Sequence, residues 1–366
     1  MSRSSLSDSA AGSGNCAGVG RRGWAPLAVG VALALSILAE SVFAADEDPL
    51  RWLEDMERAF FEQRYDGVFT FYSGRELTTL RVVHMHVDGE PRERLIHMNG
   101  APREILRQGT EITYRIGADD SLQEVLATLT GGPLTAAFVR DFAAISNHYE
   151  LRAAGSDRIA GRPARRFLVE PRDDNRHGYR LWLDEPSRLL LRSEMVDGRG
   201  QRLEIFQFTQ VTIGAEVDAS ALEPAAPAAE VSELTLDTKT AQKSAAAPSQ
   251  WMPTWLPPGF VRVTAVAHGD KAASSVSTRL FFSDGLADFS VFIEPETHVG
   301  HARVPALLES RSGATVTLSR LRQFPGAGQT PLRFTLVGEI PLATARRILD
   351  SLGSVASASA HVRNQP

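Results

Sequence analysis

Residues 251–295 contain two short motifs that decide the second half of the fold. Residues 255–260 read Trp-Leu-Pro-Pro-Gly-Phe, and residues 281–295 read Phe-Phe-Ser-Asp-Gly-Leu-Ala-Asp-Phe-Ser-Val-Phe-Ile-Glu-Pro. The first motif predicts a stiff turn that leads into a strand, because two prolines fix φ and the following glycine permits the turn. The second predicts a β-hairpin, since two β-rich runs flank the breaker Ser-Asp-Gly. Neither motif holds a nucleophile or a metal-ligand set, so neither points to catalytic chemistry.

The segment around these motifs predicts a small α+β domain over residues 251–352, followed by a flexible tail over 353–366. A closing helix is expected over 342–352, with Ile348 and Leu349 as its buried edge. Strands are expected near residues 261–267, 279–282, 289–293, 315–320 and 333–337.

Residues 1–44 have the three parts of a signal peptide. Arg21 and Arg22 form the positive region, residues 24–38 are apolar, and Val42-Phe43-Ala44 supplies a small-x-small cleavage site. The apolar run is shorter than the roughly 20 residues of a membrane span. We therefore expect general secretion and cleavage after about Ala44.

Composition excludes several classes of function. The single cysteine, Cys16, precedes the apolar run and should leave with the leader. The remaining chain then has no disulfide, no thiolate metal site, no cysteine nucleophile and no lipid-anchor cysteine. The formal net charge of −5 argues against nucleic-acid binding. The length after the leader suffices for two ordinary domains.

A larger domain is expected over residues 45–216. An amphipathic helix is predicted over 48–63, and a second helical segment within 122–145. Strand patterns separated by short turns occur at 68–72, 80–87, 93–98, 103–106, 111–116, 149–153, 164–170, 178–184, 189–196 and 202–213. This order predicts a long antiparallel sheet with helices on one side. Residues 217–250 are rich in Ala, Pro, Ser, Glu and Lys and predict a linker.

Catalytic signatures are absent from the sequence. It contains no Gly-x-Ser-x-Gly elbow, no His-Glu-x-x-His pattern and no P-loop, so we expect no enzyme activity, no catalytic residue and no cofactor.

His84, His86 and His97 could converge on one sheet face as a metal or pH-sensing site, but no carboxylate has ligand spacing there, and a polar sheet face explains them. Residues 173–177, Asp-Asp-Asn-Arg-His, could supply an acid and a base; a hydrophilic hairpin loop explains them as well.

Two sets of aromatic residues are candidates for binding. Several strands of the first domain are apolar on successive residues, so both sheet faces need a cover. Either helices cover the second face, or it lines a cavity open to a lipid chain; the candidate lining residues are Phe69, Phe71, Trp182, Phe206 and Phe208. The second domain holds the candidates for a partner-binding surface, which are Trp251, Trp255, Phe281, Phe282, Phe289 and Phe292. Some of these six must belong to the core of that domain, because successive residues of a strand face opposite ways.

Further motifs in the chain carry a family resemblance together with the opening stretch. They are Val68-Phe69-Thr70-Phe71-Tyr72, Arg92-Glu93-Arg94-Leu95 with Asn99-Gly100, Gly161-Arg162-Pro163-Ala164, Gly178-Tyr179-Arg180-Leu181-Trp182-Leu183-Asp184, Leu203-Glu204-Ile205-Phe206-Gln207-Phe208-Thr209 and Val337-Gly338-Glu339-Ile340-Pro341. In this order, behind a signal peptide, they resemble the RseB/MucB family of periplasmic regulators of the envelope-stress sigma factor.

The resemblance implies a fold and a function. It implies an α+β protein with an N-terminal half-open antiparallel β-barrel similar to LolA and LolB, a linker and a smaller C-terminal α+β domain. It implies a negative regulator that binds the periplasmic segment of an RseA/MucA-like anti-sigma factor and shields it from regulated proteolysis. Such a protein is peripheral to the inner membrane through its partner, and lipid-type or lipopolysaccharide-derived signals promote release. A periplasmic lipid or lipoprotein carrier is the alternative, and homo-oligomerisation is left open.

Overall fold

The structure is a computed structural model that describes residues 48–74, 76–117, 145–224, 231–237, 251–268, 277–296, 307–323 and 331–354. Residues 48–366 belong to one compact unit. The expected leader, most of the expected helix over 122–145 and most of the expected tail lie outside the described residues. Among the described residues, no helix has the length and apolar character needed to cross a membrane.

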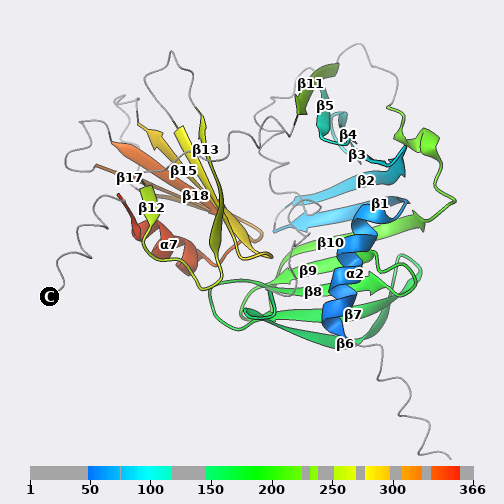
Figure 1. Ribbon diagram of the computed structural model, residues 1–366, viewed down its shortest axis with the longest axis horizontal. Coiled ribbons are helices and arrows are strands. Elements are labelled where there is room, and N and C mark those ends of the chain that lie inside the picture. Colours follow the sequence, from blue (N-terminus) through cyan, green and yellow to red (C-terminus); the bar gives the residue numbers. More distant parts are fainter. Residues whose placement is uncertain are drawn as a thin grey trace, which may run out of the picture. The chain divides into compact units, whose positions relative to one another are not determined.

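Residues 65–237 contribute an antiparallel sheet of eleven strands (Figure 1). Its strand order is β11-β5-β4-β3-β2-β1-β10-β9-β8-β7-β6, so β11 and β6 are its edges. Its strands are β1 (Tyr65–Ser73), β2 (Glu76–Val87), β3 (Glu90–His97), β4 (Arg103–Gln108), β5 (Glu111–Gly117), β6 (Tyr149–Ile159), β7 (Arg162–Pro171), β8 (Gly178–Asp184), β9 (Leu190–Val196), β10 (Arg202–Ile213) and β11 (Val231–Asp237).

Helix α2 (Pro49–Glu62) covers one face of this sheet and crosses its strands (Figure 1). The helix begins where the Asp48 carboxylate accepts a hydrogen bond from Leu50 N at 3.0 Å, with proline in the first turn. It buries one apolar stripe in the same core as β1 and β10, as the spacing of apolar residues predicts. The stripe consists of Trp52, Leu53, Met56, Ala59 and Phe60.

The other face of β2 is covered by the segment that follows β10. Val83 and Met85 are fully buried there and pack against Val217. The 3₁₀ helix η1 (Ala219–Leu222) continues this cover. η1 and β11 both lie within residues 217–250, so parts of the expected linker carry regular structure.

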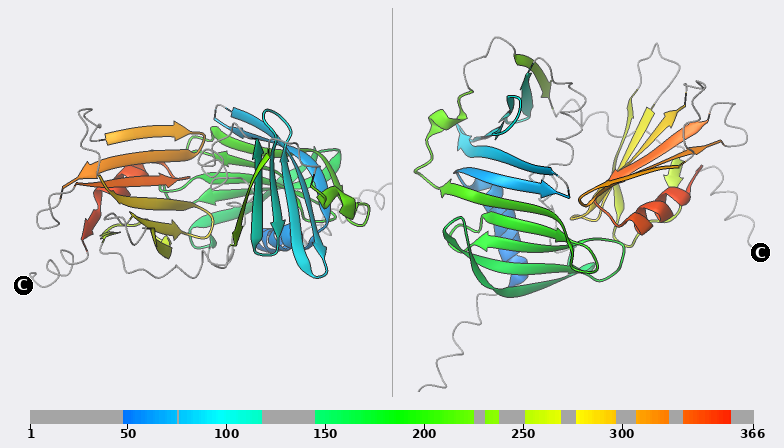
Figure 2. Two further views of the ribbon diagram at one scale, coloured as in Figure 1. Left: turned by 90° about the horizontal axis from the view of Figure 1, so that it is seen from above. Right: turned by 180° about the vertical axis from the view of Figure 1, so that it is seen from behind.

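A second antiparallel sheet has six strands in the order β13-β14-β15-β18-β17-β16. Helix α7 (Leu342–Asp350) lies against one face of it (Figure 2) and buries Ile348 and Leu349, as expected. The strands are β13 (Val261–His268), β14 (Ser277–Ser283), β15 (Asp288–Pro295), β16 (Leu307–Ser312), β17 (Thr315–Arg322) and β18 (Leu332–Gly338). A separate pair joins β12 (Trp251–Pro253) to β19 (Leu352–Ser354).

The α+β class, with an open antiparallel sheet first and a smaller α+β domain second, is confirmed. The expected hairpin at Ser283-Asp284-Gly285 is confirmed too, because β14 and β15 pair from Ser283 opposite Asp288. β16, β12 and β19 were not expected from the sequence.

Candidate functional site

Arg176, in the loop between β7 and β8, is the centre of a buried contact between the two sheets. Its side chain is fully buried, and Nη1 donates to Asp284 Oδ2 at 2.7 Å. Nη2 donates to the carbonyl oxygen of Pro258 at 2.6 Å. Nε and Nη2 also donate to the Asp173 carboxylate, each at 3.1 Å. Both sequence motifs of residues 251–295 therefore meet the first sheet at one guanidinium group.

Aromatic rings complete the surroundings of Arg176. The guanidinium carbon lies 5.5 Å from the ring centre of Tyr149 and 5.3 Å from that of Phe260, within cation–π range. The Tyr149 hydroxyl donates to Asp284 Oδ2 at 3.2 Å. Burial, followed by the nearby Asp284 charge, raises the pKa of Tyr149 well above its usual value, so it remains a donor.

The turn between β14 and β15 holds Asp284 in place for this contact. Its Oδ1 accepts hydrogen bonds from Leu286 N at 2.9 Å and from Ala287 N at 2.7 Å. The carboxylate thus closes its own turn with one oxygen and receives Arg176 and Tyr149 with the other. This arrangement satisfies a charge that is fully buried.

Gly259 makes the closest backbone approach in this contact. Its φ is +89°, and a Cβ there would lie 2.2 Å from His148 Nε2. Glycine is needed at this position both for the conformation and for the space.

A second contact joins β10 to the turn between β16 and β17. Ala314 N donates to Glu204 Oε1 at 3.1 Å, and Ala314 is fully buried. Glu204 also has a hydrogen bond with the Ser73 side chain. Gly313, at φ +57°, lies so close that a Cβ would be 2.7 Å from Glu204 Oε1.

His177 forms a third contact. It is buried at 4 % exposure and has a hydrogen bond with the backbone of Ile340, while its Nδ1 has no hydrogen-bond partner. Burial, and then the charge of Arg311, lowers the pKa of His177 to about 4, so its imidazole is neutral at pH 7. The hydrophilic loop expected over residues 173–177 is therefore only partly correct. Arg176 and His177 are buried because they dock on residues distant in sequence.

A cavity of about 50 Å³ lies next to these contacts. A buried water molecule needs roughly 10–15 Å³ of cavity volume. The cavity therefore has room for a few waters but not for a lipid chain. It is apolar apart from Ser193, Tyr179 and two carboxyl groups. Its lining residues are Leu53, Met56, Phe71, Ile145, Val169, Tyr179, Leu181, Leu190, Ser193, Met195, Glu204, Phe206, Leu286 and Glu339.

The six aromatic residues considered for partner binding do not share one surface. Trp251, Phe282 and Phe289 are core residues, and the Phe282 and Phe289 rings stack at 4.9 Å. Phe281 and Phe292 lie on the opposite face and are half-buried, with Arg279 within 5.8 Å of each ring centre. Trp255 is half-buried beneath Arg347, whose guanidinium carbon is 3.8 Å from the ring centre.

The five aromatics considered for a lipid cavity do not form one lining. Phe69 and Phe208 are fully buried core residues of β1 and β10. Only Phe71 and Phe206 line the cavity. Trp182 pairs with Arg192 across the strands and donates from its indole nitrogen to Asp157 Oδ2 at 3.2 Å.

The three histidines of β2 and β3 share one face but do not converge. His84 and His86 have ring centres 5.8 Å apart, whereas His97 lies opposite Leu80, four residues along β2 from His84. At about 3.3 Å per residue, this separates His97 from His84 by roughly 13 Å. His84 Nδ1 donates to the carbonyl oxygen of Gln63 at 2.9 Å. Among the described residues, no group of three or more His, Cys, Asp or Glu side chains could hold a metal ion.

Sequence reasoning singled out the Asp284 turn and the Pro258-Gly259 turn but missed Arg176 as their common partner. Arg176 is 108 residues from Asp284 and 82 from Pro258 along the chain. Its sequence surroundings are polar, which predicts a solvated loop. One signal could have revealed the burial of Arg176. The strand motif Gly178–Asp184, which forms β8, begins only two residues after it.

Comparisons with known proteins extend over both sheets. The family model of the MucB/RseB N-terminal domain matches residues 48–226, and that of the MucB/RseB C-terminal domain matches residues 245–353. The sigma factor AlgU regulatory protein MucB of Pseudomonas aeruginosa is 34 % identical over 85 % of this chain and 92 % of its own length. The sigma-E factor regulatory protein RseB of Escherichia coli K12 is 29 % identical over 82 % and 89 %.

Solved structures agree with these matches. The complex of Pseudomonas aeruginosa MucA and MucB contains a chain that is 31 % identical to this one, with a TM-score of 0.66 over 84 % of this chain and 99 % of that chain. A crystal structure of MucB in complex with the periplasmic part of MucA gives 30 % identity and a TM-score of 0.65 over the same shares. The curated relatives bear the names of regulatory proteins.

Proposed function

Because this chain belongs to the MucB/RseB family, we propose that it is a periplasmic negative regulator of a sigma-E-type envelope stress response. It binds the periplasmic segment of a transmembrane anti-sigma factor and shields that segment from regulated proteolysis. It acts by occlusion and not as an enzyme. Its leader, residues 1–44, is removed on export.

One observation carries this proposal. Two solved structures of MucB in complex with MucA are each similar to this chain over 84 % of its length, both sheets included. The likeness therefore covers the whole binding protein and not one domain. Three motifs of the resemblance, around Gly259, Asp284 and Ile340, contribute to the contacts between the sheets.

The direct test uses the exported chain and the periplasmic segment of a transmembrane anti-sigma factor from the same organism. Titration calorimetry should detect a saturable one-site complex. Adding the site-1 type protease to the segment, with and without this chain, should show slower cleavage when the chain is present. If the segment shows no binding heat and is cleaved at the same rate in both samples, the proposal is wrong.

We place part of the partner surface on the face of the second sheet that carries Phe281 and Phe292. These two rings flank Arg279 and are half-buried, whereas Phe282 and Phe289 point into the core. Aromatic residues, phenylalanine included, and arginine are both enriched in the buried core of protein interfaces. Trp255 beneath Arg347 is a second aromatic of the same kind.

Replacing both Phe281 and Phe292 by alanine tests this surface. Truncating a hot-spot residue of an interface to alanine costs about 2 kcal/mol of binding free energy or more. We therefore expect affinity for the anti-sigma segment to fall at least about 30-fold. Phe61→Ala is the matched control, because Phe61 is a 46 % exposed phenylalanine on α2. If the control weakens binding as much as the double variant does, the surface is assigned wrongly.

We further propose that lipid-type signals act at the cavity beneath α2, which Phe71 and Phe206 line together with Leu53 and Met56. A lipid chain needs more than the about 50 Å³ present, so its binding must widen the cavity. Under the regulator hypothesis, added amphiphile should release the bound anti-sigma segment. Under the carrier alternative, the chain should instead retain lipid through purification and transfer it to acceptor vesicles.

A further inference from the structure

Three carboxyl groups gather near the second contact between the sheets. Glu204 of β10 and Glu339, which follows β18, both line the cavity. Asp288, at the start of β15, interacts electrostatically with Glu339. Among the described residues, none of these three forms an ion pair within 4 Å, although arginine is abundant in the chain. Like charges so placed repel one another across the contact unless protons remain bound.

The position of Glu204 is fixed by the neighbouring turn. Its Oε1 accepts from Ala314 N, its side chain bonds Ser73, and its carboxylate lies close against Gly313. Glu204 therefore cannot turn to solvent without losing the bond that joins β10 to the turn between β16 and β17. Glu339 faces it from the second sheet.

The groups around Glu339 supply no compensating charge. Burial first, and then the charges of Glu204 and Asp288, raises the pKa of Glu339 well above its usual value. From β8, the cavity is faced by Tyr179, whose pKa is also raised well above its usual value, first by burial. From α2 and β9 it is faced by uncharged side chains, namely Leu53, Met56, Leu190, Ser193 and Met195.

The other two carboxyl groups of the three, Asp288 and Glu204, also have raised pKa values. Burial raises the pKa of Asp288 to about 6, Arg279 of β14 opposes that rise, and Asp284 adds to it. The loop before β8 contributes His177, which faces Arg311 and Asp197 and is neutral. Burial also raises the pKa of Glu204, against the hydrogen bonds from Ala314 and Ser73.

We propose that Glu204 and Glu339 are a proton-operated latch between the two sheets, which holds them together while the pair keeps a proton and weakens their contact when both groups ionise. The Arg176–Asp284 contact acts beside the latch as a permanent anchor. This regulation goes beyond the proposed function and does not depend on it, because it concerns this chain alone.

The sign of the pH dependence follows from the raised pKa values. A carboxyl group whose pKa is higher in the docked state stabilises that state below its undocked pKa, and this stabilisation is lost as pH rises through the docked value. Each unit by which docking raises the pKa changes the ratio of docked to undocked protein about tenfold. The latch therefore closes at mildly acid pH and loosens toward alkaline pH.

Single-molecule energy transfer between the two sheets measures this directly. Dyes are attached at Glu54→Cys on α2 and Ala343→Cys on α7, both exposed positions, in the exported chain without residues 1–44, which has no other cysteine. We expect the docked-to-undocked ratio to fall at least about tenfold between about pH 5.5 and about pH 8.5 relative to a Glu339→Gln chain, in which only Glu204 can ionise and no pair of like charges forms. At acid pH the two chains should agree.

The comparison with Glu339→Gln isolates the latch from the opposite titration of His177, which both chains share. Glu294→Gln is the matched control, since Glu294 is an exposed glutamate on β15. Two results would overturn the proposal. One is an equal ratio for the wild type and Glu339→Gln at alkaline pH; the other is a difference that persists unchanged at acid pH.

Discussion

Among single residues, Arg176 joins the two sheets through several kinds of contact at once. It is an ion-pair partner, a hydrogen-bond donor to the Pro258 carbonyl and a cation between two rings, all at full burial. Removing one member of a buried ion pair leaves the other charge uncompensated, which costs about 3–5 kcal/mol. An exposed pair with equal distance contributes at most about 1 kcal/mol.

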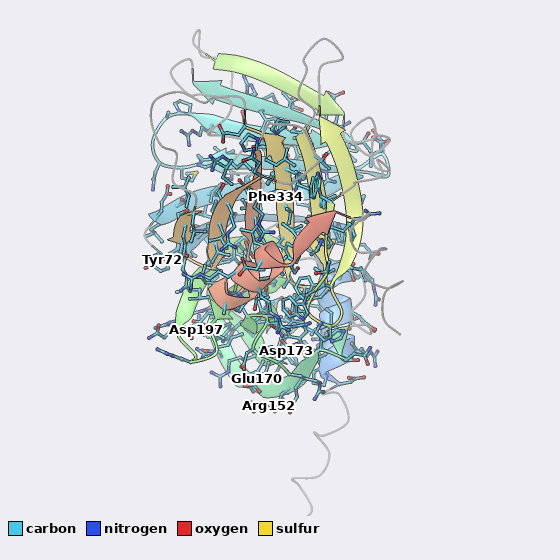
Figure 3. All side chains as sticks on the ribbon, turned by 90° about the vertical axis from the view of Figure 1, so that its left-hand side faces the viewer. Tyr72, Arg152, Glu170, Asp173, Asp197 and Phe334 are labelled. Atoms are coloured by element: carbon cyan, nitrogen blue, oxygen red, sulfur yellow. The ribbon has the colours of Figure 1, made fainter. Side chains whose placement is uncertain are left out.

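We predict that Arg176→Ala lowers the free energy of unfolding by about 3–5 kcal/mol, measured by urea denaturation. Arg152→Ala is the matched control. Arg152 pairs with Glu170 at the same 2.7 Å, but both side chains are about half exposed, and the two residues lie side by side at the edge of the sheet (Figure 3). The control should lose no more than about 1 kcal/mol.

The double variant Arg176→Ala/Asp284→Ala separates the ion pair from the rest of the contact. Removing both charges abolishes the uncompensated carboxylate, so the double variant should lose less than the sum of the two single variants. Additive losses would show that the contact is held by the aromatic rings and the Pro258 bond alone.

Among the elements, the segment from Val217 to η1 has an unexpected role in covering a sheet face. It packs on Val83 and Met85, and the Ala221 carbonyl accepts a hydrogen bond from Arg94 Nη1 at 3.1 Å. Arg94 and Arg115 both pair with Glu104 beneath this cover. The segment therefore shields a charged group of β3, β4 and β5 as well as an apolar patch of β2.

Val217→Asp tests this cover, because it places a carboxylate at a position that is 3 % exposed. We expect the free energy of unfolding to fall by more than about 2 kcal/mol, since the charge is buried without a partner. Val261→Asp, at a 62 % exposed position of β13, is the control and should stay within about 0.5 kcal/mol of the wild type. Equal losses in urea denaturation would exclude a covering role for the segment.

The elements also show what the sequence can predict. The hairpin turn at Asp88-Gly89 is read correctly, because both residues adopt positive φ, which these residue types tolerate. β16 is missed because all six of its residues are exposed, so no apolar alternation marks it. β12 and β19 are missed because a three-residue pairing leaves no periodic signal.

At the scale of the whole molecule, the sequence predicts the two sheets but not how charges are distributed between them. Asp284 and Gly259 are identified as turn residues from local chemistry. The burial of Arg176, His177 and Glu204 depends on partners that lie about a hundred residues away along the chain or farther. A charged residue in a polar stretch of sequence is predicted to be exposed to solvent. Its burial becomes visible only when the tertiary structure shows its partners.

His177 provides the last prediction, which concerns the stability of the whole chain against acid. Its pKa is lowered from 6.5 to about 4, chiefly by burial, so the unfolded chain binds a proton more readily than the folded chain does. The stability that depends on neutral His177 is present above pH 6.5 and is lost as pH falls toward 4. At about 1.4 kcal/mol per unit, the loss is on the order of 3 kcal/mol.

His177→Gln removes this titration and keeps an amide that can donate to the Ile340 backbone. Between about pH 7 and about pH 4.5, the wild type should lose about 2–3 kcal/mol more free energy of unfolding than His177→Gln does. Comparing the two chains at each pH cancels the opposite contribution of Asp288 and Glu339, which both share. His86→Gln, at an exposed position of β2, should behave as the wild type. Parallel curves for the wild type and His177→Gln would mean that His177 gains solvent access before it is protonated.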